Sequence, residues 1–131
     1  FFSSDLTFFI RGGRISKTAG FFGNMLKICP VMDVEPDGSL AVREKVRTKR
    51  RAERRVLELM RELAQGGDGY GGKVFISNSA CLGDAQDVAR MIEGEFPQMD
   101  GPVQHFDIGA TIGCHTGPGT VATFFWGKER A

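Results

Sequence analysis

Residues 28–47, ICPVMDVEPDGSLAVREKVR, form the stretch that decides the fold. Two apolar-rich runs, 31–35 and 40–46, lie on either side of a Pro-Asp-Gly turn. In the second run Leu40 and Val42 alternate with other residues, as expected of a half-buried strand. A Pro-Asp-Gly turn between two such runs predicts a β-hairpin, so at least one pair of strands is antiparallel.

The segments around the hairpin add helices and further strands. Before it, a helix begins at an N-cap Ser4 and ends at Gly12, and a second helix is expected over 16–27. After it, a glycine-rich break at 66–72 separates a basic helix from a β-α-β pattern. The expected elements are a helix over about 48–65, strands 73–77, 103–108 and 121–126, and a helix over 84–96. A hairpin combined with β-α-β connections predicts an α/β fold: a two-layer α/β sandwich with a mixed sheet and its helices on one face.

Length and composition are those of a single globular domain. The chain has 131 residues, of which 41% are hydrophobic and 25% charged. A chain of this length buries roughly two-thirds of its unfolded surface. It begins without Met at FFSSD, and two aromatic residues at this place resemble the end of a strand. We therefore expect residues 1–131 to be one domain cut from a longer protein.

Cysteine content and hydropathy indicate the compartment. Cys29, Cys81 and Cys114 are an odd number without metal-ligand spacing, which predicts neither a disulfide framework nor a zinc site. No signal peptide or membrane-spanning run is present in the sequence. The expected localisation is a reducing cytoplasm.

A glycine-rich segment, ATIGCHTGPGTV at residues 110–121, is the main candidate for a binding site. Its glycines allow backbone N–H groups to surround an anion, while His115 and Thr116 offer further donors. Alternatively, the glycines serve only a turn between two strands. The only other histidine, His105, is ten residues away on an expected strand, so metal binding or general-base catalysis by His115 has no support.

Three segments in order resemble one family. They are DLTFFIRGGRIS, GNMLKICPVMDVEPDGSLAVREKVR and DIGATIGCHTGPGTVATFF, which together cover nearly the whole chain. Their order and spacing are similar to those of the DegV-type fatty-acid-binding proteins. One segment departs from the family pattern: after strand 73–77 this chain has SNSACLGD, so no role is carried over to 77–79.

The resemblance implies a function and a place within a larger protein. Family members have two domains with a long-chain fatty acid between them, and this chain is similar to the second, C-terminal domain. The missing N-terminal domain would then supply the rest of the site. The fatty acid would be the bound ligand, with no cofactor and no metal, and its carboxylate would be presented to a partner kinase.

The resemblance also implies the site residues. Arg14 lies near the head group in the family, and a guanidinium can bind a carboxylate through two hydrogen bonds. Arg14, Ser16, His115, Thr116 and Gly117 are therefore expected around the carboxylate. Ser16 has an equally good alternative as an N-cap of the second helix. The group Phe21, Phe22 and Met25 would line the acyl chain, although such an apolar stripe is also typical of an ordinary core.

The charge of the chain is unevenly distributed. Its net charge is +1, yet residues 43–55 hold eight basic and two acidic residues. The expected helix there presents Lys49, Arg50, Arg51 and Arg54, which would dock the kinase by attracting an acidic surface. An alternative is nucleic-acid or polyanion binding through the same segment, and a third is an ordinary solvated helix face.

No arrangement in the sequence predicts an enzyme. It contains neither a nucleophile–base pair nor a metal cluster nor a phosphate-binding loop of the nucleotide-hydrolase type. The expected role is therefore a non-catalytic lipid carrier. Because removing a domain exposes apolar surface, we also expect this chain to self-associate.

Overall fold

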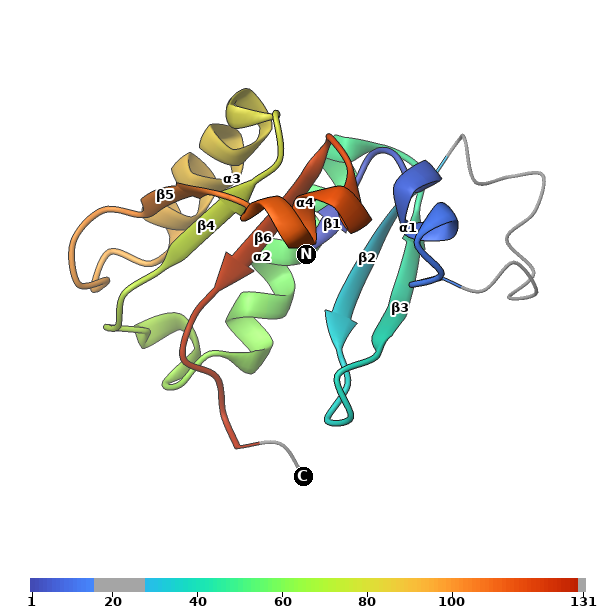
Figure 1. Ribbon diagram of the computed structural model, residues 1–131. Coiled ribbons are helices and arrows are strands. Elements are labelled where there is room, and N and C mark those ends of the chain that lie inside the picture. Colours follow the sequence, from blue (N-terminus) through green and yellow to red (C-terminus); the bar gives the residue numbers. More distant parts are fainter. Residues whose placement is uncertain (16–27, 130–131) are drawn as a thin grey trace.

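The computed structural model describes residues 1–15 and 28–129 (Figure 1). Its centre is one six-stranded sheet in the order β3-β2-β1-β6-β4-β5. The strands are β1 (Phe2–Ser3), β2 (Cys29–Val34), β3 (Leu40–Val46), β4 (Phe75–Asn78), β5 (Gln104–Asp107) and β6 (Thr120–Phe124). The β4–β5 pair is parallel and the other pairs are antiparallel, so the sheet is mixed, as predicted.

The hairpin is formed by β2 and β3. Val34 lies opposite Leu40, and the Pro-Asp-Gly turn connects the two strands. Gly38 has a φ of 89°, a value that favours glycine, and the Asp37 carboxylate accepts the Ser39 N–H at 2.8 Å. The turn chemistry in the sequence therefore fixes this half of the sheet, and the predicted hairpin is confirmed.

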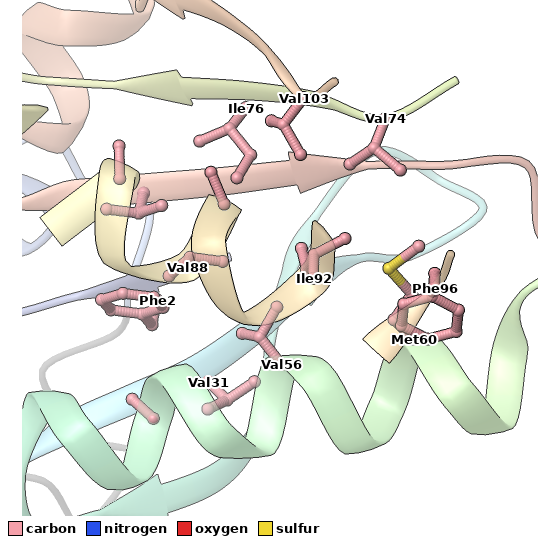
Figure 2. Packing of buried hydrophobic residues seen from close by; sticks show 14 of the residues in the cluster. Phe2, Val31, Val56, Met60, Val74, Ile76, Val88, Ile92, Phe96 and Val103 are labelled. Carbon is pink, nitrogen blue, oxygen red and sulfur yellow. The ribbon is translucent and has the colours of Figure 1, made fainter. Parts of the chain in front are cut away.

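Two long helices cover one face of the sheet. They are α2 (Lys49–Leu63) and α3 (Leu82–Glu95). Figure 2 shows Val56 and Met60 of α2 and Val88 and Ile92 of α3 among the side chains that pack between the helices and the strands. Phe2 of the central strand is fully buried in the same cluster. The main core therefore lies between the sheet and these two helices, which is the predicted two-layer arrangement.

The basic helix has a clear start signal. Thr48 is its N-cap, and the threonine hydroxyl accepts the Arg51 N–H at 3.2 Å. The helix ends before Ala64, whose backbone is extended. The predicted helix over 48–65 is confirmed to within two residues.

The short helix α1 (Thr7–Arg11) differs from its prediction. Its N-cap is Leu6, not Ser4, because the Asp5 carboxylate rather than a serine hydroxyl accepts the Thr7 N–H, at 2.9 Å. Phe9 of α1 packs with Met32 in a second cluster, separate from the main core. Since Met32 and its neighbour Val31 belong to different clusters, α1 adds a small layer to the opposite face of the sheet.

Strands β4, β5 and β6 and helix α3 occur near their predicted places, whereas two short helices were not predicted. A one-turn 3-10 helix, η2, covers Gly67–Gly69, and a fourth helix, α4, covers Ala110–Thr116. The helix expected over 16–27 lies outside the described residues. Within the described part of the chain, no helix is both long and apolar enough to cross a membrane.

Candidate functional site

The glycine-rich segment 110–121 is not the irregular loop that the sequence predicted. Ala110–Thr116 form helix α4, which tolerates Gly113 in its interior. The helix stops at Gly117, whose φ is 68°, and Gly119 follows with a φ of 91°. Positive φ is accessible to glycine at no steric cost, so the second and third glycines form the turn and the first does not.

Hydroxyl groups from three segments hold this turn in place. The Ser79 hydroxyl donates to the Gly117 carbonyl and accepts the Thr120 N–H at 3.1 Å. On the other side, the Thr120 hydroxyl donates to Ser3 Oγ at 3.1 Å, and this pair is buried. Ser79 had no expected role, and here it positions the end of α4. A serine directly after a strand and facing a glycine turn is the signal that could have identified it.

Helices α1 and α4 contact each other through their glycines. A side chain on Gly117 would lie 2.2 Å from the Phe8 ring, and one on Gly12 would lie 3.0 Å from the His115 ring. The Arg14 guanidinium donates to the Gly12 carbonyl at 2.7 Å. Gly12 therefore brings together two predicted head-group residues, Arg14 and His115, that are a hundred positions apart in the sequence.

His115 and Thr116 differ in what they offer a ligand. The His115 Nδ1 lies 2.8 Å from the Thr111 carbonyl, which can only accept, so Nδ1 carries a proton and Nε2 faces away from the helix. The Thr116 hydroxyl oxygen is buried and has no hydrogen-bond partner among the described residues. A buried hydroxyl without a partner costs free energy, which a ligand accepting from it would recover.

The predicted contribution of four site residues is not tested by the structure. Ser16, Phe21, Phe22 and Met25 lie outside the described residues. The structure therefore gives no position for the apolar group that was expected around the acyl chain.

A second apolar surface was missed by the sequence analysis. Phe75, Phe106 and Phe124 lie on the sheet face opposite α2 and α3, and the Phe75 and Phe106 rings are 5.7 Å apart. Phe106 is 49% exposed, Phe124 is 53% exposed, and Trp126 at the end of the same region is 71% exposed. The signal was present, because 75–76 and 124–126 place apolar residues on both faces of a strand, which indicates a sheet covered on both sides.

The predicted docking residues are only partly available. Lys49 pairs with Asp84 at 3.3 Å, and Arg55 in the same basic segment pairs with Glu44 at 2.6 Å. Arg50, Arg51 and Arg54 are exposed and form no ion pair among the described residues. Within the described residues, Arg47, just before α2, is likewise exposed and forms no ion pair, so the unneutralised charge of the segment lies on these three arginines and Arg47.

An acidic cluster lies beside the basic segment. Glu53, Asp84 and Asp87 place their carboxylates within 4.8 Å of one another. Burial of Glu53, together with repulsion from Asp87 and Asp84, raises the pKa of its carboxyl group. Lys49 lies against this cluster and partly compensates its charge. The Lys49 ammonium group is therefore the positive partner of the acidic cluster.

Two of the three cysteine thiols have a raised pKa. Burial raises the pKa of the Cys29 thiol to about 12, so this thiol stays protonated near neutral pH. Burial also raises the pKa of Cys81. His115 faces a backbone carbonyl through Nδ1 rather than a hydroxyl or thiol.

Fold and site together define a class of protein. It is an α/β domain with an open mixed sheet, two helices on one face, and a cluster of donors where two short helices meet through glycines. The family model described as "Uncharacterised protein, DegV family" matches residues 1–128. The chain therefore belongs to the DegV family.

Relatives and solved structures agree with this assignment. A DegV domain-containing protein of Streptococcus pyogenes serotype M1 is 35% identical over 118 residues, which cover 90% of this chain and 40% of the relative. A fatty-acid-binding DegV family protein from Streptococcus agalactiae has a TM-score of 0.75 at 29% identity, covering 93% of this chain and 41% of that one. This chain thus spans about two-fifths of the proteins it matches.

A further structure shares the fold at lower identity. The Streptococcus pneumoniae Fatty Acid Kinase B3 protein, solved with linoleic acid, has a TM-score of 0.76 and 19% identity. The match covers 93% of this chain and 41% of the pneumococcal protein. At this identity the likeness shows the fold alone.

Proposed function

We propose that this chain is the C-terminal domain of a fatty-acid carrier, and that the long-chain fatty acid lies between it and an N-terminal domain. The observation that carries this proposal is the junction of α1 and α4. There the Thr116 hydroxyl is buried without a partner among the described residues, and Gly12 contacts both the Arg14 guanidinium and the ring of His115, the residue before Thr116. The description of the Streptococcus agalactiae protein as fatty-acid-binding supports the choice of ligand.

The carboxylate of the ligand would bind at this junction. The Thr116 hydroxyl donates one hydrogen bond, and Nε2 is the His115 nitrogen left to donate another, because Nδ1 is held by Thr111. Arg14 supplies the third donor after releasing the Gly12 carbonyl. Gly117 contributes space, since any larger residue there would contact Phe8 and change the distance between the helices.

The acyl chain requires an apolar surface away from water. The open sheet face with Phe75, Phe106 and Phe124 supplies one, and the proposed N-terminal domain would cover it. Phe21, Phe22 and Met25 are proposed to contribute to the same lining. The protein acts as a cytoplasmic carrier without catalytic residues of its own.

Presentation to a kinase would use the three arginines of α2 that form no ion pair within the described residues. Arg50, Arg51 and Arg54 form an exposed positive surface on the first turns of α2. Such a surface raises the association rate with an acidic partner, more than it raises the affinity. Charge therefore brings the carrier to the kinase, and the bound carboxylate is the group that is phosphorylated.

The first experiment identifies the ligand and its head-group site. The full-length protein is purified from a fatty-acid-containing host, denatured, and its extract analysed by mass spectrometry. We expect one fatty acid per chain. Thr116→Val and His115→Asn should each lower fatty-acid affinity about tenfold, as expected for the loss of one charge-assisted hydrogen bond.

A matched control is available on the edge strand. His105 lies on β5, away from the α1–α4 junction, and His105→Asn should leave fatty-acid affinity unchanged. A full-length protein that is empty and does not bind added fatty acid would contradict the proposal. Equal loss of affinity in both histidine variants would contradict the head-group assignment and leave the ligand in place.

Kinase docking has its own test. The variant Arg50→Glu/Arg51→Glu/Arg54→Glu should keep its fatty acid and lower the rate of acyl phosphate formation, with a weaker salt dependence than the parent. Arg90→Glu, on α3, is the control. If heparin retains the parent and not the triple variant while the kinase reaction is unchanged, polyanion binding is the better assignment for these arginines.

A further inference from the structure

Strand β5 is an open edge of the sheet. It is last in the strand order, and within the described residues β4 is the strand that it pairs with (Figure 1). All four of its residues, Gln104–Asp107, are exposed. The outer side of an edge strand presents backbone N–H and carbonyl groups without partners, so it can pair with a strand of another chain.

The hydrogen bonds to β4 show which residues of β5 direct their backbone outward. The Gln104 N–H donates to the Val74 carbonyl at 3.1 Å, and the Ile108 N–H donates to the Asn78 carbonyl at 2.9 Å. Because backbone direction alternates along a strand, the N–H and carbonyl groups of His105 and Asp107 point away from β4. These groups are the ones that a further strand would meet.

The sequence of β5 is complementary to itself. His105 and Asp107 are two positions apart, so their side chains lie on one face of the sheet and that of Phe106 lies on the other. In an antiparallel pair of two β5 strands centred on Phe106, His105 would lie opposite Asp107 of the partner subunit, and this contact would occur twice. The backbone groups that point outward are then those that exchange hydrogen bonds across the pair. A histidine ring donates an N–H to a carboxylate in either protonation state.

The aromatic side chain of β5 fits the same arrangement. The two copies of Phe106 would lie directly opposite each other at a non-hydrogen-bonded position, where side chains across an antiparallel pair are closest. Phe106 is 49% exposed, and its ring is 5.7 Å from that of Phe75. Pairing would therefore cover part of Phe106 and add a cross-strand aromatic contact.

The other edge strand, β3, lacks this complementarity. It has charged residues at three consecutive positions, Arg43, Glu44 and Lys45, and the Arg43 guanidinium pairs with Asp33 at 2.7 Å. Its pairing with β2 also contains a register shift. Lysines, other charges and irregular pairing are the features that keep edge strands from associating. Strand β5 contains no lysine, arginine or proline.

We propose that two copies of this protein associate through their β5 strands, as an antiparallel pair about a two-fold axis at Phe106. The six-stranded sheet of one copy then continues into that of the other. The partner is a second copy because the contacts match only when the two strands are the same. Shifting the register by one step in either direction brings two histidines or two aspartates opposite each other and loses both His105–Asp107 contacts. The pairing uses the edge of the sheet, so it does not depend on the proposed fatty-acid site.

The first test exchanges the two polar residues and measures the dimer Kd of the full-length protein by analytical ultracentrifugation. His105→Asp places aspartates opposite each other twice in the dimer, and should raise the Kd about tenfold or more. Asp107→His should raise it as well. The double variant His105→Asp/Asp107→His restores the opposite partners in reverse order, and should return the Kd to within about threefold of the parent. A monomeric parent, or a double variant as weak as His105→Asp, would overturn the proposal.

Disulfide formation tests the register. Phe106→Cys should form a disulfide between two copies under mild oxidation, because Cα atoms of a non-hydrogen-bonded pair lie within disulfide range. Gln104→Cys is the control, since two such cysteines would be about 13 Å apart along the strands. The parent shows any disulfide formed by the exposed Cys114. More disulfide in Gln104→Cys than in Phe106→Cys would overturn this register.

Association through the open aromatic face has a different result. Trp126 follows β6, and β4 separates β6 from β5, so Trp126→Lys should leave the Kd of the β5 dimer nearly unchanged. If Trp126→Lys abolishes association and His105→Asp has no effect, the contact belongs to the aromatic face, and the proposal is wrong.

Discussion

At the scale of single residues, the geometry of the site depends on two glycines, because glycine has no side chain. Gly12 and Gly117 allow α1 and α4 to approach each other, because a side chain at either position would meet His115 or Phe8. Gly117 has the additional constraint of a positive φ. The donors of the site are thus positioned by glycines that make no contact with a ligand themselves.

Replacing Gly117 by Ala should be strongly destabilising. The added carbon would lie 2.2 Å from the Phe8 ring in a backbone conformation that non-glycine residues rarely adopt. We expect a loss of about 2 kcal/mol or more in the free energy of unfolding, measured by urea denaturation. Gly113→Ala is the control: Gly113 lies inside α4 with open space around it, and alanine there should be neutral or stabilising by up to about 1 kcal/mol. Equal effects would show that the contact with Phe8 does not matter.

Glu53 should make stability depend on pH in an unusual direction. Burial and the nearby Asp87 and Asp84 raise its folded pKa above the ordinary 4.5, so the native state holds this proton more tightly than the unfolded state does. The contribution of Glu53 to stability is therefore lost as pH rises from the unfolded pKa through the higher folded one. Glu53→Gln should raise the urea midpoint at pH 7 relative to the parent, and this advantage should vanish at pH 4.

The exposed Glu58 provides the comparison for that experiment. It pairs with Arg55 at 3.1 Å, and its side chain is 57% exposed. Glu58→Gln should change stability little at either pH, since exposed ion pairs are worth about 0–1 kcal/mol. If Glu53→Gln also has no effect at pH 7, the buried carboxylate is better compensated by Lys49 than we infer.

At the scale of elements, the ends of helices and strands were predicted correctly where residues close in the sequence determine them. The hairpin turn and the N-cap of α2 follow from residues within a few positions of each other. The start of α1 was misplaced because the Ser4 hydroxyl donates to the distant Gly119 carbonyl, while the Asp5 carboxylate accepts the Thr7 N–H. Helix α4 was missed because three glycines resembled a loop, whereas only the last two terminate the helix.

The N-cap of α2 gives a prediction at this scale. Thr48→Ala removes the hydroxyl that accepts the Arg51 N–H, and should lower the free energy of unfolding by about 1 kcal/mol in urea denaturation. Thr48→Ser retains the hydroxyl and should lose much less. The basic surface formed by Arg50 and Arg54 follows the cap, so Thr48→Ala should also slow kinase docking if that surface is used. Equal stability of the two variants would mean that α2 is held by tertiary packing alone.

At the scale of the whole molecule, the two faces of the sheet are covered to different extents. The face under α2 and α3 is buried, and part of the other face is covered by α1. The remainder presents Phe106 and Phe124, with Trp126 at its edge, to solvent. An apolar surface of this kind usually contacts another domain or another molecule.

This surface predicts self-association of the 131-residue chain. Light scattering should give a mass above that of the monomer at high protein concentration. Phe106→Lys/Trp126→Lys should shift the chain toward the monomer, because a charge on this face would be buried on association. Leu82→Lys is the control, since Leu82 is 51% exposed at the start of α3, away from the aromatic face. A chain that is monomeric at all concentrations would contradict this prediction.

The sequence by itself determined the features that depend on neighbours in the chain: the hairpin, the limits of the long helices, the basic segment and the family. It also named His115 and Thr116 as donors of a glycine-rich segment, and Arg14 with the help of the family resemblance. Tertiary structure alone decided that Gly12 joins Arg14 to His115 and that Ser79 holds the turn after α4. It alone decided that aromatic residues of β4, β5 and β6 share one open face. Turn and cap signals act over a few bonds, whereas these contacts join segments up to a hundred residues apart, and no local pattern encodes them.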